Sequence, residues 1–348
     1  MIKRILIAIA VLAILAAIAA YTFFSSFRSG ANAWKEPLGD IDLVTQAIPL
    51  NTADPDQTHI GPLEYLGGFK LTSPHIRFGG LSGLHISADG SELLAVTDQG
   101  LWMHALPIYD NGRLVGLEQG YFDQMRRKPG RLLGWEFGDA ESLFVTPDMT
   151  AYIGLEDKHR IITFGPREGH GLKTMLDDKT GPATTIWLPD QDALPRNGGV
   201  EAMTMLPDGS LLLLTEELEN PDGTLVGWIL TGEDFAPLSF QPKDGFSPVA
   251  MDRLPSGDLL VLERRYTPIL GVASRLCIVK GADVMPGASL HCKQIAELKS
   301  PYSVDNLEGM AIRPDGPHSD SVIVYLLSDD NFNNTQDTLL MMFRLELG

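Results

Sequence analysis

The sequence predicts an all-β fold, a β-propeller of six four-stranded blades, behind an N-terminal signal or anchor helix. Three observations support this prediction. After residue 34 the apolar residues form short stretches bounded by Gly, Pro, Asp or Asn, without the periodicity of amphipathic helices. The stretches recur as copies of one pattern. The 35 glycines and 23 prolines supply the turns that many short strands require.

Each copy consists of an apolar stretch, a tight turn rich in Pro, Asp and Gly, and a second apolar stretch that ends in an acidic residue. Glycine in such a turn supplies the positive φ that hairpins need. The copies span residues 79–98, 139–156, 199–216, 248–263 and 305–329. Their period of about 50 to 60 residues is too long for a solenoid coil and suits a propeller blade with loop insertions.

A sixth blade is expected from the two ends of the domain. Apolar stretches near residues 63–71 and 339–347 lie outside the five copies. If they share one blade, they close the ring and leave no sheet edge open. The propeller is therefore expected to span residues 63–348, after a linker or lead-in over residues 34–62.

The N-terminus carries an export signal. Lys3 and Arg4 precede an apolar stretch over residues 5–24, and Ala31-Asn32-Ala33 follows it. A basic segment, an apolar segment and an A-x-A site are typical of a secretory signal, although this apolar stretch is also long enough to cross a bilayer. Residues 1–33 are therefore either a cleaved signal peptide or an inner-membrane anchor. Both alternatives place the domain in the periplasm or elsewhere outside the cytoplasm.

Charge and cysteine content narrow the functional classes. The formal net charge of −18 opposes a phosphate backbone, which excludes nucleic acid as a partner. Cys277 and Cys292 lie in apolar stretches on either side of a turn-rich segment. If these stretches form a hairpin in an oxidising compartment, the two residues are expected to form a disulfide. The alternative is two buried thiols. The oligomeric state is not indicated.

The acidic residues recur at one register. Glu201 and Glu216 are symmetric about one predicted turn, and Glu141 and Glu156 are symmetric about another. We therefore expect each pair to lie directly opposite across a hairpin, with Cβ atoms about 5 Å apart. Like charges placed in this way destabilise a sheet unless another charge offsets them.

If the first strand of each copy lines the central channel, these carboxylates cluster at one end of it. Such a cluster favours a hard divalent cation, with calcium as the expected cofactor. The expected ligands are Asp98, Glu141, Glu156, Glu201, Glu216, Glu263, Glu308 and Asp329. The alternative is that each acid pairs with a neighbouring base. Arginine donates fork-shaped hydrogen bonds to anions, so Arg160, Arg196 and Arg264 are expected to bind a small anionic ester. Glu201, Glu216 and Glu141 are the candidate catalytic carboxylates that activate water.

Several motifs in order resemble the phytase-like propeller family, which is described by an esterase-like activity of phytase. The motifs are GGLSGL (79–84), DAE (139–141), NGGVEA (197–202), LVLER (260–264), DNLEG (305–309), SDDNF (328–332) and QDTLL (336–340). The resemblance covers residue 63 to the end and implies an exported propeller that hydrolyses phosphate or other esters with calcium. Ser82 and Val249 depart from the pattern, because they stand where other copies carry the first glutamate.

The sequence therefore favours an exported, metal-dependent ester or phosphoester hydrolase. A second interpretation is a non-catalytic propeller that binds a ligand or partner, with calcium in a structural role. A third is a propeller lactonase or sugar dehydrogenase with the same acidic channel. Fold alone does not decide among them.

Overall fold

The computed structural model describes residues 36–347, except residues 128–130, 135–137, 167–170, 178–180, 190, 270 and 317–318. The predicted signal or anchor at residues 1–33 lies outside this part of the chain. Within the described part, no helix is both long and apolar enough to cross a membrane.

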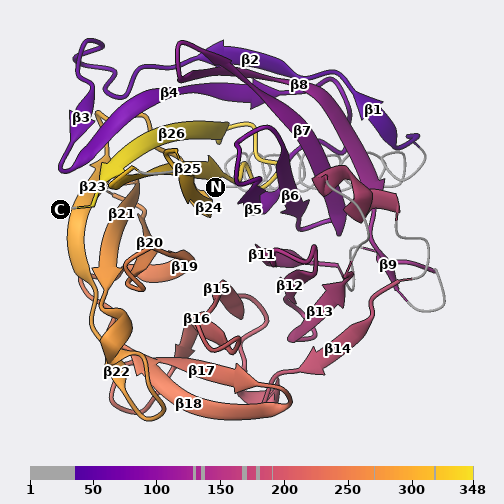
Figure 1. Ribbon diagram of the computed structural model, residues 1–348, viewed down its shortest axis with the longest axis vertical. Coiled ribbons are helices and arrows are strands. Elements are labelled where there is room, and N and C mark those ends of the chain that lie inside the picture. The colour runs from indigo at the N-terminus through magenta and orange to yellow at the C-terminus, as the bar shows by residue number, and fades with distance from the viewer. Residues whose placement is uncertain are drawn as a thin grey trace, which may run out of the picture.

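The described chain is almost entirely β-structure, arranged as five sheets around a central axis (Figure 1). Each sheet is one blade of a propeller, numbered here in chain order. Blade 1 contains β5 (Leu81–Ile86), β6 (Leu93–Thr97), β7 (Leu101–Asp110), β8 (Arg113–Gln124) and β1 (Gly39–Ile41). Blade 2 contains β11 (Ala140–Val145), β12 (Ala151–Leu155), β13 (Arg160–Phe164) and β14 (Thr184–Trp187).

The remaining blades follow the same plan. Blade 3 contains β15 (Val200–Met205), β16 (Leu211–Glu219), β17 (Leu225–Thr231), β18 (Asp234–Phe240) and β22 (Ser289–Leu290). Blade 4 contains β19 (Ser247–Arg253), β20 (Leu259–Thr267), β21 (Gly271–Val279) and β23 (Lys293–Lys299). Blade 5 contains β24 (Leu307–Pro314), β25 (Ser321–Ser328), β26 (Thr338–Glu346), β4 (Leu63–Thr72), β2 (Val44–Ala47) and β3 (His59–Ile60).

Few elements lie outside the blades. A two-stranded ribbon is formed by β9 (Arg126–Arg127) and β10 (Arg131–Leu132). Among the described residues, three short 3₁₀ helices occupy loops: η1 (Leu172–Asp177), η2 (Gln191–Ala193) and η3 (Gly281–Asp283).

The propeller class is confirmed, but the expected number of six blades is wrong. The N-terminal strand β4 pairs with β26, and β26 pairs with β25 of the fifth sequence copy. The two ends of the chain therefore complete blade 5 and form no separate sixth blade. Blade 5 takes β24 and β25 from the fifth copy, β26 from the stretch that follows it, and its fourth strand, β4, from the N-terminal stretch. Both ends of the domain do close the ring, as expected.

The segment expected to lead into the domain also contributes strands. β1 pairs with the outer strand β8 of blade 1, and β2 pairs with β4 of blade 5. The described part of residues 34–62 therefore covers outer strands of two adjacent blades, where it shields backbone groups that would otherwise be unpaired.

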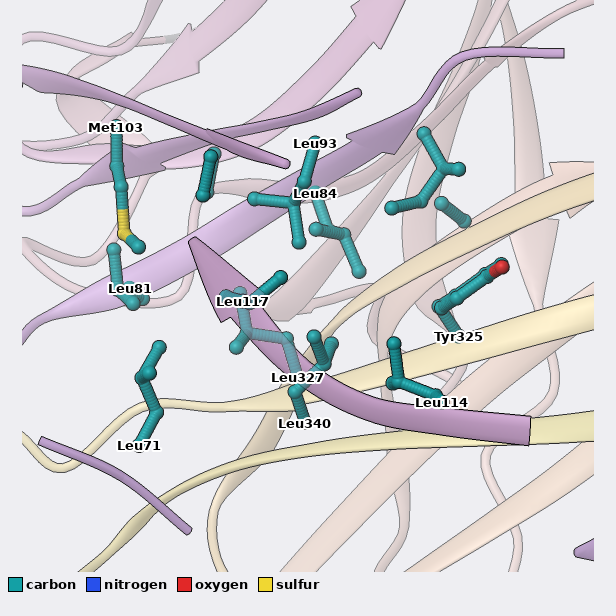
Figure 2. Packing of buried hydrophobic residues seen from close by; sticks show 14 of the residues in the cluster. Leu71, Leu81, Leu84, Leu93, Met103, Leu114, Leu117, Tyr325, Leu327 and Leu340 are labelled. Atoms are coloured by element: carbon teal, nitrogen blue, oxygen red, sulfur yellow. The ribbon is translucent and has the colours of Figure 1, made fainter. Parts of the chain in front are cut away.

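The hydrophobic core lies between neighbouring blades. Figure 2 shows one interface, where Leu84 of β5 and Leu117 of β8 pack with Leu327 of β25. All three side chains are buried, and burial of such a leucine contributes about 1.5 to 3 kcal/mol. Because each sheet packs on the next, the inner strands β5, β11, β15, β19 and β24 are held around the central axis (Figure 1).

The expected disulfide between Cys277 and Cys292 is present. Cys277 lies on β21, and Cys292 immediately precedes β23, which pairs antiparallel with β21. Their Cα atoms are 5.4 Å apart. The bond links the two outer strands of blade 4.

Candidate active site at the mouth of the central channel

A β-bulge interrupts the inner hairpin of every blade at the same place. In blade 3, Val200 pairs with Thr215 and Ala202 pairs with Leu214, so Glu201 has no residue opposite it. Glu141, Val249 and Glu308 are the corresponding extra residues in blades 2, 4 and 5, and the bulge of blade 1 falls at Ser82 and Gly83. A bulge bends the strand and changes the direction of its side chain.

The bulge corrects one expectation about the acids. Glu201 and Glu216 are not directly opposite, and neither are Glu141 and Glu156. Glu156 and Glu216 each come directly after the last residue of the second strand that pairs with the first strand. The backbone N–H of Glu216 donates to the carbonyl of Gly199 at 3.1 Å. The extra residue in the first strand shifts the register by one, which sequence symmetry about the turn does not reveal.

In each blade the two inner strands form a hairpin, and the second-strand residue directly after the one paired just before the bulge lies at an equivalent place. We call this place the second ring position. It is Asp98, Glu156, Glu216 or Asp329 in four blades, and each of these donates its backbone N–H to the blade's first inner segment. In blade 4, Arg264 occupies this position, because it pairs with Ser247 at the start of the ladder. The prediction that Glu263 is equivalent to these acids is therefore wrong, because Glu263 lies one residue before the second ring position. A one-residue offset in a strand turns the side chain to the opposite face.

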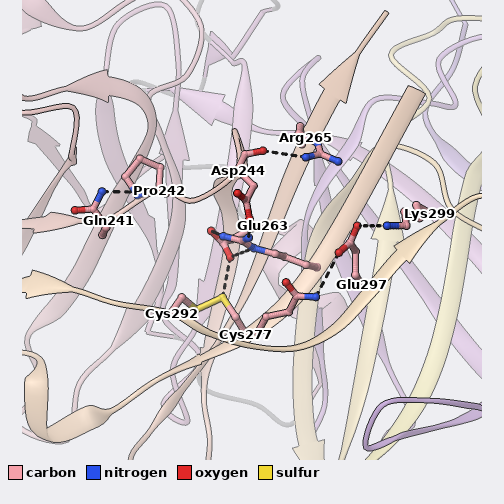
Figure 3. A network of polar contacts seen from close by, with 11 residues as sticks. Gln241, Pro242, Asp244, Glu263, Arg265, Cys277, Cys292, Glu297 and Lys299 are labelled. Atoms are coloured by element: carbon pink, nitrogen blue, oxygen red, sulfur yellow. Dashed lines mark hydrogen bonds and ion pairs between the residues drawn. A yellow bond between two sulfur atoms is a disulfide. The ribbon is translucent and has the colours of Figure 1, made fainter. Parts of the chain in front are cut away.

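Glu263 is bound to a different partner (Figure 3). Arg275 donates to it from Nε at 2.5 Å and from Nη2 at 2.9 Å. One Glu263 oxygen also lies 2.8 Å from the Sγ atom of Cys277. Although Glu263 was predicted as a metal ligand, its carboxylate is already satisfied by an arginine beside the disulfide.

The bulge acids converge on one small cavity in the channel. Glu141, Glu201 and Glu308 line it together with apolar side chains that include Met203 and Met310. The cavity has a volume of about 10 Å³, which is close to the minimum for one water molecule. This geometry confirms that the first strands line the channel.

Three carboxylates of blade 2 lie close together. One oxygen atom each of Asp139, Glu141 and Glu156 lies within 4.8 Å of the others. Burial raises the pKa of Glu156 to about 7, although the N–H of Gly199 donates to its Oε1 at 2.6 Å. Burial also raises the pKa of Glu141 well above its usual value, with further contributions from Glu308 and Glu156. Asp139 belongs to the DAE motif, but it was not among the ligands predicted from the sequence, because it lies outside the position at which the acids recur.

Asp98 and Asp329 extend this group across blades 1 and 5. Burial and the neighbouring Glu308 and Asp98 raise the pKa of Asp329 to about 9. Burial and the nearby Asp139 and Glu308 raise the pKa of Asp98 well above its usual value. The Oδ1 atom of Asp98 is buried and has no hydrogen-bond partner in the described part of the chain. Such an orphaned oxygen among carboxylates fits a bound cation.

Arg264 joins three blades at the ring. It donates to Oε1 of Glu216 at 2.6 Å and to Oε1 of Glu308 at 2.5 Å, and it also contacts Oδ1 of Asn306. The other two predicted substrate-binding arginines lie elsewhere. Arg160 donates to the carbonyl of Lys158 at 2.6 Å and stacks over Trp187, whereas Arg196 is 78% exposed and pairs with Asp157.

An open cleft adjoins the ring on the side of blades 3, 4 and 5. We call it the lateral cleft. It has a volume of about 960 Å³, and its lining includes Glu216, Arg264, Arg265, Tyr266, Asn306 and Asn331. A ligand in this cleft would contact the ring through Glu216, Arg264 and Asn306.

The fold and site define a five-bladed propeller with a buried carboxylate ring and a polar cleft beside it. The chain belongs to the phytase-like family described as "Esterase-like activity of phytase", whose model matches residues 76–332. This match confirms the family expected from the motifs. It places the chain among propellers described by an esterase-like, and therefore hydrolytic, activity.

Two solved structures show a distant similarity to the chain. A gluconolactonase from Xanthomonas campestris is 8% identical, covers 89% of this chain and 95% of its own, and superposes with a TM-score of 0.42. The N-terminal domain of Nup159 is 12% identical, covers 82% of this chain and 96% of its own, and has a TM-score of 0.35. No curated protein matches the chain significantly.

Proposed function

We propose that this protein is an exported hydrolase of phosphate or other esters that depends on a divalent cation, with calcium as the expected ion. The observation that carries the proposal is the buried group of Asp139, Glu141 and Glu156, whose oxygens lie within 4.8 Å of one another, beside the unpartnered Oδ1 of Asp98. Carboxylate oxygens are the ligands that calcium prefers. When bound, the cation would polarise a carbonyl or phosphoryl oxygen of the substrate.

The surrounding residues supply the remaining functions. Glu201 lines the water-sized cavity, and burial together with Glu216 raises its pKa well above the usual value. A carboxylate with a raised pKa is a stronger base toward water, so we assign Glu201 as the group that accepts the proton of the attacking water. Arg264 holds Glu216 and Glu308 in place and offsets their charge. Export is supported by the N-terminal segment and by the disulfide.

The test is hydrolysis of aryl phosphate, inositol phosphate and short-chain aryl esters by the purified protein, with calcium or with a chelator. We expect calcium-dependent turnover, and we expect Glu201→Gln to reduce it by about 100-fold or more. Calorimetry should show that a double Asp139→Asn, Glu141→Gln variant no longer binds calcium. Glu118→Gln, at an exposed site on β8, is the control that should retain both properties.

Two results would contradict the proposal. Turnover that persists in the chelator would exclude the cation requirement. Absence of turnover on every substrate, with calcium still raising the melting temperature, would favour a non-catalytic binding propeller with structural calcium.

A further inference from the structure

The lateral cleft provides a binding surface that the carboxylate ring does not use. Its volume of about 960 Å³ is at the upper end of the range for small-molecule sites. It meets the ring at Glu216 and Arg264, so an ester attached to a group bound in the cleft would lie beside these two residues of the ring.

The lining is rich in uncharged hydrogen-bonding side chains. Amide and hydroxyl groups come from Ser247, Tyr266, Asn331, Asn333, Thr335 and Gln336. Tyr266 is 68% exposed. No hydrogen bond to another described residue is made by the side chains of Ser247, Tyr266 or Asn331, so their donors and acceptors are free for a ligand.

The charges of the cleft do not suit a polyanion. Its lining contains the carboxylates Glu216, Glu217 and Asp305 and the cations Arg264 and Arg265. Arg264 is already paired with two carboxylates. Arg265 donates from Nη1 to the carbonyl of Asp244 at 2.9 Å (Figure 3) and stacks at 4.5 Å over the ring of Phe246. A ligand that carries several phosphates would therefore meet more negative than positive charge.

We propose that the lateral cleft binds an uncharged, polyhydroxylated group of the substrate, such as a sugar ring or a cyclic polyol. The exposed ring of Tyr266 offers an apolar face for the C–H side of such a group. The amide of Asn331 pairs with the hydroxyls, which present adjacent donors and acceptors. This inference rests on the proposed function, since it names the substrate class of the same site.

The test measures binding in the presence of chelator, so that it is independent of turnover and of the cation. Ligand-observed NMR with D-glucose, D-galactose and myo-inositol should detect saturable binding of at least one compound. Inositol hexakisphosphate should bind at least about tenfold more weakly than the best neutral compound. Tyr266→Ala should weaken binding by about tenfold, Tyr266→Phe should retain most of it, and Asn331→Ala should also weaken it.

Met285→Ala is the matched control, because Met285 is a large side chain that is 53% exposed and lies outside the cleft. Melting curves of all variants show whether each one is folded. The assignment is overturned if none of the neutral compounds binds, if the hexakisphosphate binds most tightly, or if Met285→Ala weakens binding as much as Tyr266→Ala.

These results separate the two proposals. Binding of a neutral polyol without hydrolysis of any ester supports the cleft assignment and contradicts the hydrolase. Calcium-dependent hydrolysis without binding of any neutral polyol supports the hydrolase and overturns the cleft assignment.

Discussion

At the scale of single residues, the balance of charge at the channel mouth depends on Arg264. Four blades place an acid at the second ring position, and blade 4 places this arginine there. Its two ion pairs, with Glu216 and Glu308, link three blades. Buried carboxylates of like charge repel one another, so one cation at this position reduces the cost of gathering them.

The partly buried residue His85 on β5 gives a pH-dependent prediction. Burial lowers the pKa of His85 to about 4, below its ordinary value of 6.5. The folded state therefore disfavours the protonated ring. The stability that the neutral ring contributes is fully present above pH 6.5 and is lost as the pH falls through 4. We expect His85→Gln to make the protein more resistant to acid, by about 2 kcal/mol in the free energy of unfolding at pH 4 relative to pH 7.

Urea unfolding of wild type and His85→Gln between pH 7 and pH 4 measures this difference. Because the acids of the ring titrate in both proteins, the difference between the two curves isolates the histidine. Parallel curves over this range would contradict the prediction.

At the scale of elements, the repeated bulge and nearby glycines bring the inner strands together. A Cβ atom at Gly309 on β24 would lie 2.5 Å from the backbone oxygen of Ser82 on β5. A Cβ atom at Gly83 would lie 2.6 Å from the backbone nitrogen of Leu143 on β11. These glycines sit beside the bulges, where they allow neighbouring blades to approach closely around the channel.

Replacement of Gly309 tests this close approach. Gly309→Ala forces β24 and β5 apart, because the obstructing atom belongs to the backbone and has little freedom to move. We expect the free energy of unfolding to fall by about 1 to 3 kcal/mol. Gly116→Ala on β8 is the control, since its Cβ would meet two side-chain atoms, Thr45 Oγ1 at 3.3 Å and Ile108 Cδ1 at 3.6 Å, and no backbone atom within 4 Å. Equal free energies of unfolding of the two variants in urea would contradict the prediction, because the inner strands would then move apart without loss of stability.

At the scale of the whole molecule, the ring is closed by strands from the two ends of the domain. The pairing of β4 with β26 removes two open sheet edges and makes blade 5 depend on residues nearly the whole domain apart in sequence. The disulfide closes a much shorter loop and stabilises the protein in a different way, because it restricts the unfolded chain.

The stabilisation by the disulfide can be measured. Cys277 and Cys292 are 15 residues apart, and closing a loop of this length contributes about 3 kcal/mol. We expect a double Cys277→Ser, Cys292→Ser variant to lose about this much in guanidinium unfolding. The wild type in reductant should show a similar loss, and the reductant should not change the variant. No difference between oxidised and reduced wild type would contradict the prediction.

The sequence alone determined the repeat, the propeller class and the family, because hairpin turns and apolar stretches are local features that recur along the chain. It also identified Glu141, Glu201 and Glu308 as inner-strand acids, since each precedes a recognisable turn. These conclusions need no knowledge of how distant strands pair.

The tertiary structure decided the blade number, the register of the acids and the partners of the charged groups. β4 joins blade 5 through pairing with β26, a contact between the two ends of the domain that no local pattern encodes. In blade 4 the pairing of Pro248 with Glu263 and of Ser247 with Arg264 places Arg264, and not Glu263, at the second ring position. A shift of one residue is invisible in the hydrophobic pattern near the strand ends, yet it decides which side of the sheet a charge faces.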